Sequence, residues 1–142
     1  MSTILVNTLT GTSTAGSIAV TGEGNSTTTN LQQGLAKAWC AFNTVTNHST
    51  FDSFNTSGLT DNGSGDTTIS YTSNMAAAKS YAVTGVMSDA SDVTNAVYSS
   101  QPKQDDSVAT GSLRAVHAFA QASSAGIGDI AYNCNVIHGD LA

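Results

Sequence analysis

Charged side chains are scarce in this chain. Only 10% of its 142 residues are charged, well below the roughly 25% that is usual for globular domains. Lysine and arginine together number 4, against 10 aspartates and glutamates, and the formal net charge is −6. Because a chain so poor in cations lacks a basic surface for phosphate groups, we expect neither nucleic acid nor anionic lipid as a partner.

Long hydrophobic runs are missing as well. No apolar segment approaches the ~20 residues that span a bilayer. The first residues, Met1, Ser2 and Thr3, provide no basic region ahead of a hydrophobic stretch. We therefore expect a soluble chain, made in the cytoplasm without a signal peptide and without membrane insertion.

Strong helix formers for a protein surface are also few. The sequence has one glutamate and three lysines, whereas 39 of its 142 residues are serine or threonine. Threonine fits the pleated surface of a strand better than a helix. With a length that suits one domain and a short arm, the composition predicts a mostly β protein.

Alternating apolar and polar residues mark the strands. Asn62-Gly63 and Ser64-Gly65 stand between two alternating runs, which predicts a β-hairpin over residues 59–71. A polar stretch from about 88 to 106 predicts a surface loop. Short strands with turns at regular spacing indicate an antiparallel β-sandwich or jelly-roll-like body over residues 34–142. The other predicted strands cover residues 35–42, 80–87, 113–119 and 130–137.

Residues 1–33 differ from the rest and predict an N-terminal β arm. Two short strands with turns, one ahead of Gly11 and one over residues 17–21, hold only a handful of large apolar residues. A two-stranded ribbon is marginal alone in water. The arm therefore packs on the body or pairs with other copies of the chain, and we favour the second. The residues that oligomerisation or attachment would bury are Ile4, Leu5, Val6, Leu9, Ile18 and Val20.

The two cysteines, Cys40 and Cys134, are too few and too far apart for a metal ribbon or a disulfide framework. Each stands in apolar alternation, where cysteine usually behaves as a small buried hydrophobe. We expect two reduced core thiols. A disulfide stays open as an alternative if the first and last core strands pair.

Catalytic and metal-binding patterns are absent from the sequence. It has no Gly-x-Ser-x-Gly elbow, no paired glutamates and no phosphate loop. We interpret His48, His117 and His138 as surface or core residues, and a metal held by the last two would require their strands to pair. The sequence therefore predicts no enzyme, no catalytic residue, no cofactor and no metal.

Aromatic residues offer the remaining candidates for contact with a ligand. Trp39 stands in the middle of a predicted strand, which favours packing in the core or in an interface. Tyr98 stands in the long polar segment and is the better candidate for external contact.

Several runs of the sequence, in this order, resemble a module found at the ends of bacteriophage tail fibres and other virion appendages, common in marine phages. The resemblance covers roughly residues 34–142. Cys40 and Cys134 depart from it, and segment 88–111 has no counterpart in it. The runs that carry the resemblance are residues 34–43, 52–55, 59–66, 80–85 and 128–140.

This resemblance implies a β-rich, trimeric virion protein without catalytic residues, whose partners are its own copies and other proteins of the capsid or tail. Because only about 30 residues precede the module, we expect a small knob, a short fibre or a decoration protein on the particle surface. Contact with the host surface is compatible with this role. The alternative is a lectin-like module that binds host surface glycans during attachment.

Overall fold

In a computed structural model, the chain divides into two compact units, Met1–Leu35 and Ala36–Ala142, which we call the arm unit and the body. The structure describes residues 4–11, 18–21, 28–88, 96–104, 107–121 and 124–142.

The arm unit contains a two-stranded ribbon and one helical turn. Strand β1 (Ala19–Thr21) pairs antiparallel with β2 (Thr28–Asn30), and α1 (Leu31–Gly34) follows directly. The side chain of Asn30 accepts a hydrogen bond of 2.8 Å from the backbone N–H of Gln32, which satisfies a free donor of the helical turn.

The prediction of a strand near the start of the arm is wrong. Residues 4–11 contain no strand, and the partner of β1 is the later segment β2. A strand forms only where a second strand satisfies its backbone hydrogen bonds. The apolar residues of this segment lack such a partner among the described residues of the arm unit.

The body consists of short strands. They are β3 (Ala36–Asn43), β4 (Ser49–Phe54), β5 (Thr56–Asp61), β6 (Asp66–Tyr71), β7 (Ala82–Ser88), β8 (Val97–Pro102), β9 (Ser112–Ala120), β10 (Ala125–Ile127) and β11 (Tyr132–His138).

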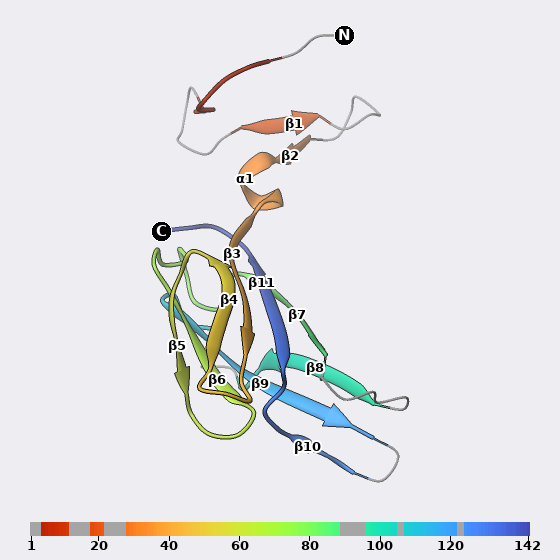
Figure 1. Cartoon of the computed structure of the whole chain (residues 1–142). Coiled ribbons are helices and arrows are strands. Elements are labelled where there is room, and N and C mark those ends of the chain that lie inside the picture. Colours follow the sequence, from red (N-terminus) through yellow and green to blue (C-terminus); the bar gives the residue numbers. More distant parts are fainter. Residues whose placement is uncertain (1–3, 12–17, 22–27, 89–95, 105–106, 122–123) are drawn as a thin grey trace. The chain divides into compact units, whose positions relative to one another are not determined.

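These strands form two sheets. Sheet 1 has the order β4-β3-β11-β7, and sheet 2 has the order β10-β9-β6-β5 with β8 also paired to β9. All of these pairings are antiparallel. Figure 1 shows β9 of sheet 2 running obliquely to β11 of sheet 1. The prediction of a mostly β, antiparallel, sandwich-like body is confirmed.

The predicted hairpin over residues 59–71 is confirmed. Strands β5 and β6 form it, with Leu59 opposite Ile69. At its turn, Gly63 and Gly65 adopt φ values of 120° and 68°, which a residue with a Cβ rarely adopts. The first and last long strands of the body pair, which the sequence left open, and Cys40 of β3 lies opposite Asn135 of β11.

Asn55 carries the chain from one sheet to the other. It alone separates β4 of sheet 1 from β5 of sheet 2, and its φ of 54° is left-handed. Its side-chain N–H groups donate to the backbone oxygens of Lys37 and Ser73, both at 3.0 Å. Its side-chain oxygen accepts a 2.6 Å bond from the backbone N–H of Ser73. The corner is therefore held by contacts to β3 of sheet 1 and to the segment that follows β6 of sheet 2.

The two sheets also approach each other where β7 passes β8. At Gly85 of β7, an added Cβ would lie 2.6 Å from the backbone oxygen of Ser100 in β8. The hydroxyl of Ser100 lies 3.0 Å from the side-chain oxygen of Asn135 on β11. Glycine is required here because β8 occupies the space that a side chain would take.

The core lies between the two sheets. Sheet 1 contributes alternate residues of β3, and sheet 2 contributes β6 and β9. Polar residues share this interior, since His117, Asn133 and Asn135 are fully buried. The buried hydrophobic cluster is Ala38, Cys40, Phe42, Ile69, Tyr71, Met75, Leu113, Ala115 and Ile137.

The prediction of a surface loop over residues 88–106 is wrong for its second half. Strand β8 lies there and pairs with β9 from Val97 opposite Ala120 to Pro102 opposite Ala115. Because the strand contains serines and a glutamine, the alternation of apolar and polar residues does not reveal it. Hydroxyl side chains are nevertheless tolerated on an edge strand. The single proline ends this strand, where it is permitted.

Candidate functional site

The apolar side chains predicted for assembly are mostly exposed in the arm unit. Leu5 and Ile4 are 90% and 81% exposed, and Val6, Leu9 and Val20 are about half exposed or more. Ile18 is half-buried. Because burying such side chains stabilises by roughly 1.5–3 kcal/mol each, this set offers a strong driving force to any partner that covers it.

Leu9 and Ile18 also line an open hollow of about 440 Å³ together with Leu31, Gln32 and Leu35. The backbone N–H of Leu31 donates a 2.8 Å bond to the oxygen of Ile18, which holds the two segments together. Sequence reasoning missed Leu31 and Leu35. Their spacing of four residues around one helical turn is the signal that could have found them.

Tyr98, predicted for external contact, lies on β8 opposite Phe119 of β9. Its ring is half-buried, and its hydroxyl oxygen is buried with no hydrogen-bond partner among the described residues. Both rings line a small hollow of about 120 Å³ that also contacts Asp129 and Gln121. The hollow thus combines aromatic rings with a carboxylate.

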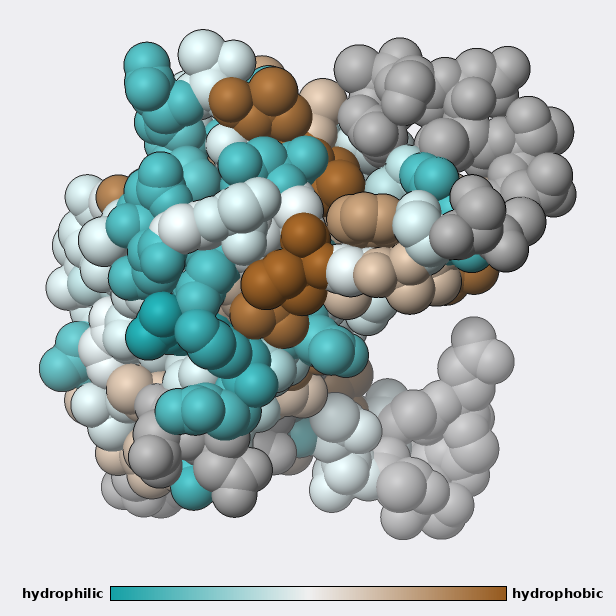
Figure 2. Space-filling model, turned by 90° about the horizontal axis from the view of Figure 1, so that it is seen from below, coloured by the Kyte–Doolittle hydropathy of each residue, from teal (hydrophilic) through white to brown (hydrophobic). Residues whose placement is uncertain are grey.

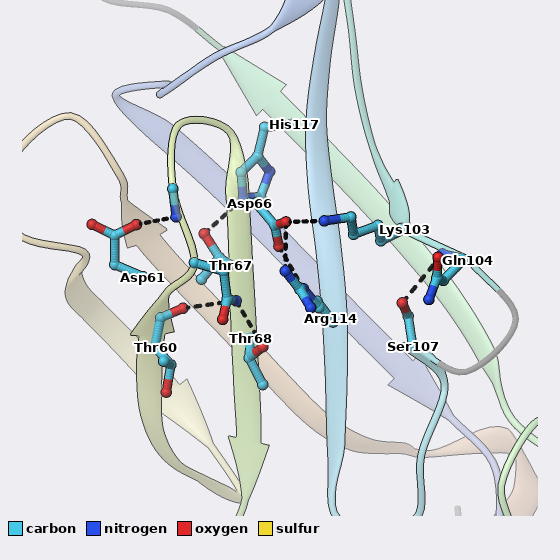
Figure 3. Close-up of polar contacts among 12 residues, drawn as sticks. Thr60, Asp61, Asp66, Thr67, Thr68, Lys103, Gln104, Ser107, Arg114 and His117 are labelled. Atoms are coloured by element: carbon cyan, nitrogen blue, oxygen red, sulfur yellow. Dashed lines mark hydrogen bonds and ion pairs between the residues drawn. The ribbon is translucent and has the colours of Figure 1, made fainter.

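The most strongly charged cluster of the body surrounds Asp66 at the start of β6 (Figure 3). Arg114 binds both of its carboxylate oxygens, at 2.8 and 2.9 Å, and the Lys103 ammonium group binds one of them. The Arg114 hydrogen bonds, with a smaller contribution from Lys103, lower the pKa of Asp66 to about 2. The cluster links β6, β9 and the residue after β8, and we interpret it as a structural contact that stabilises sheet 2.

His117 is buried within the body. Its Nε2 lies 3.1 Å from the Thr67 hydroxyl, and its ring meets Phe42 edge to face. Burial lowers the pKa of His117 to about 4, so the ring is neutral at pH 7. Since Thr67 is also fully buried, the imidazole and hydroxyl are shielded from a substrate in solution.

The structure does not bring His117 and His138 together on paired strands. β9 pairs with β6, β8 and β10, while β11 pairs with β3 and β7. The third histidine, His48, has its Nδ1 atom 3.6 Å from a carboxylate oxygen of Asp61. Within the described ranges, no group of three histidine, cysteine, aspartate or glutamate side chains is close enough to hold a metal ion.

The two cysteines are both free and differ in burial. Cys40 lies in the core, and burial raises the pKa of its thiol to about 11. The prediction that Cys134 is buried in the core is wrong, since it is half-exposed on β11. Neighbouring residues of a strand point to opposite faces, so Asn135, which pairs with Cys40, takes the inward position in its place.

Figure 2 shows, on one face of the molecule, teal and pale areas with brown patches between them. Pale areas are expected where small hydroxyl side chains supply much of the polarity. Among the described residues, no helix is long and apolar enough to span a membrane.

Comparison with known families, curated proteins and solved structures yields no match to the chain.

Proposed function

We propose that the chain is a non-enzymatic structural protein of a bacteriophage particle: a small trimeric knob, short fibre or decoration protein on the capsid or tail surface. The observation that carries this proposal is the arm unit, in which six large apolar side chains are exposed among the described residues. The residues of the buried hydrophobic cluster all belong to the body. The resemblance of residues 34–43 and 128–140 to the virion module supports the same role.

Assembly through the arm follows from elementary strand chemistry. β1 and β2 form a ribbon of only two strands, each of which has an edge unpaired by described residues. Such edges add strands from another chain through backbone hydrogen bonds. Closed symmetry among copies satisfies these edges without leaving new ones open, and a homotrimer is the form that the resemblance implies.

An antibody raised against the chain would test the location on the particle. Applied to intact and tail-less particles of the phage that encodes the chain, it should decorate the particle surface. Decoration of tail-less particles would assign the protein to the capsid, and decoration lost with the tail would assign it to the tail. Absence of the chain from purified particles of both kinds would refute the proposal.

The hollow beside Tyr98 favours a lectin-like role in host attachment as the second candidate. An aromatic ring and a carboxylate, here Tyr98 and Asp129, offer a sugar both an apolar surface and a hydrogen-bond acceptor. Titration with purified surface polysaccharide should then show binding that Tyr98→Ala weakens. Val45→Ala, an exposed apolar residue outside this hollow, serves as the control.

A further inference from the structure

The outer face of sheet 1 carries two rows of mostly apolar side chains. The strand register places Phe54, Trp39, Val136 and Thr84 in one row, and Asp52, Ala41, Cys134 and Val86 in the next. Figure 1 shows the four strands of this sheet side by side. Phe54 and Val86 are 52% and 56% exposed. We call these eight residues the outer rows.

Strand β11 runs through the middle of this face with an unusual polarity. Asn133, Asn135 and Ile137 point into the body and are fully buried, while Cys134 and Val136 point outward. A strand with one solvated face normally turns its apolar side chains to the core and its polar ones to water. The arrangement of β11 is favourable only if its outer face is also covered.

An aromatic pair continues the face beyond the outer rows. The rings of Phe51 and Tyr132 stack with centroids 6.2 Å apart and planes 19° from parallel, and both residues are exposed. Exposed tryptophan, tyrosine and phenylalanine are characteristic of the centres of protein interfaces. Contiguous apolar patches on a protein surface usually mark a binding site.

Charge indicates the kind of partner. Asp52 is the one charged side chain in the outer rows, whereas each copy of the chain carries a net charge of −6. Two copies repel each other over most of their surfaces, and the repulsion is weakest where charged groups are absent. A sugar would need many hydrogen-bonding groups, and these rows offer only Asp52 and Thr84.

We propose that the outer rows of sheet 1 pack against other copies of the same chain in the assembled protein. The inference rests on the proposed trimer and adds the surface by which the bodies meet, beyond the arms. In a trimer, the three copies of this face surround the threefold axis, where their outer rows meet. Burial of both rows then explains why β11 turns Cys134 and Val136 away from the core.

The face contains its own reporters for a test on the full-length chain. Cys134 is half-exposed in the single chain, while Cys40 is buried and serves as an internal control for folding. Sedimentation first identifies one concentration at which the chains are single and another at which they are assembled. The rate of maleimide labelling of Cys134 should be about tenfold lower, or lower still, at the second concentration than at the first. The emission of Trp39, the only tryptophan, should become less accessible to acrylamide over the same range.

A pair of variants makes the test specific. Val86→Asp places a charge directly beside Cys134 in the register, so Cys134 should label rapidly at every concentration. Val97→Asp introduces the same charge at a 71% exposed position on β8 of the other sheet and should leave the protection of Cys134 intact. In both variants, Cys40 should stay unlabelled if the body is folded.

The outcomes separate this inference from the proposed function. Assembled chains in which Cys134 labels as fast as in single chains would overturn the inference and leave arm-driven assembly standing. Single chains at all concentrations would refute the proposed trimer and, with it, this contact. Protection of Cys134 that Val86→Asp abolishes and Val97→Asp preserves would establish the face as the contact.

Discussion

The arm unit and the body place the same kinds of side chain in opposite surroundings. Leu5 of the arm is 90% exposed, whereas Leu113 and Ile137 of the body are fully buried. The body encloses its core between two sheets, whereas the described residues of the arm form one two-stranded ribbon and a helical turn. An aliphatic side chain is thus buried or exposed according to the strands around it, and the described part of the arm has no second layer like that of the body.

The largest contrast should come from removing a core ring. Phe42→Ala should lower the free energy of unfolding by about 3–5 kcal/mol, because the fully buried ring leaves a cavity beside His117. The arm variant Leu5→Ala should change it by less than about 0.5 kcal/mol. Urea denaturation followed by circular dichroism measures both. Equal losses for the two variants would contradict the division into a self-sufficient body and a dependent arm.

Acid should weaken the body through His117. Its pKa in the folded body is about 4, against an ordinary value of 6.5. Below pH 6.5 the unfolded chain binds a proton that the folded chain refuses, so stability falls as the pH drops from 6.5 to about 4. The full loss is about 3 kcal/mol.

Urea midpoints measured at pH 7, 5.5 and 4 would follow this loss. The variant His117→Gln has no titrating ring, and its stability should therefore change much less over that window. If the stability of this variant falls with pH as steeply as that of the natural chain, groups other than His117 cause the loss in acid. The Asp66 carboxylate acts at lower pH, because its pKa is lowered to about 2 and its stabilisation is lost only as the pH falls below 3.8 toward that value.

The contact between the two sheets should be sensitive to a single methyl group. Gly85→Ala should cost about 1–3 kcal/mol, because its Cβ would lie 2.6 Å from the Ser100 backbone oxygen. Gly58→Ala is the matched control on β5, where nothing lies within 4 Å of the added Cβ. The control should be neutral or slightly stabilising, since alanine restricts the unfolded chain. Thermal unfolding of the two variants would show whether the close approach exists.

Replacing either cysteine by alanine should change the free energy of unfolding by a smaller amount, and the two variants should differ. Cys40→Ala should cost roughly 1–2 kcal/mol, because the thiol fills core volume. Cys134→Ala should cost less than about 1 kcal/mol for the unfolding of a single chain, since that side chain is half-exposed. Urea denaturation at concentrations below assembly measures this difference. A larger loss at Cys134 would show that its outward position is wrong.

The smallest effect on body stability should come from a charge in the arm. Leu5→Asp should leave the free energy of unfolding within about 0.5 kcal/mol. It should nevertheless abolish assembly, because a carboxylate cannot be buried against apolar partners without a large desolvation cost. Sedimentation velocity of the full-length variant checks this expectation. A variant that sediments like the natural chain would exclude Leu5 from the assembly contact.

The predictable part of the fold followed from local patterns. The hairpin over 59–71 was predictable because Asn-Gly and Ser-Gly permit the left-handed backbone at its turn. The pairing of β3 with β11 was only a possibility in the sequence, since no local signal chooses a partner nearly 100 residues away. β8 was missed because its polar residues resemble a loop, and its bonds to β9 supply what its composition lacks.

The candidate contact surfaces were less predictable than the fold. The apolar residues of the arm were identifiable, because a short apolar segment without a second layer has few ways to be buried. The outer rows were not, because Trp39 was expected to pack in the core or in an interface, and Cys134 was expected to be a core thiol. Which face of the sheet each side chain occupies depends on the neighbouring strands with which it pairs.

By itself, the sequence determined that the chain is mostly β, poor in charge and interrupted by turns. These properties follow from its composition and from the alternation of apolar and polar residues with a period of two. Tertiary structure alone decided which side of each strand is buried. On β11, alternation is equally compatible with burying Cys134 and Val136 or burying Asn133 and Asn135. The structure buries the asparagines: the side chain of Asn133 donates to the backbone oxygen of Ile130, and the Ser100 hydroxyl lies within hydrogen-bond distance of Asn135. Among the described residues, the Asn133 Oδ1 and the Asn135 Nδ2 have no hydrogen-bond partner. A period of two shows that a strand has two faces, and only its neighbours can select the inner one.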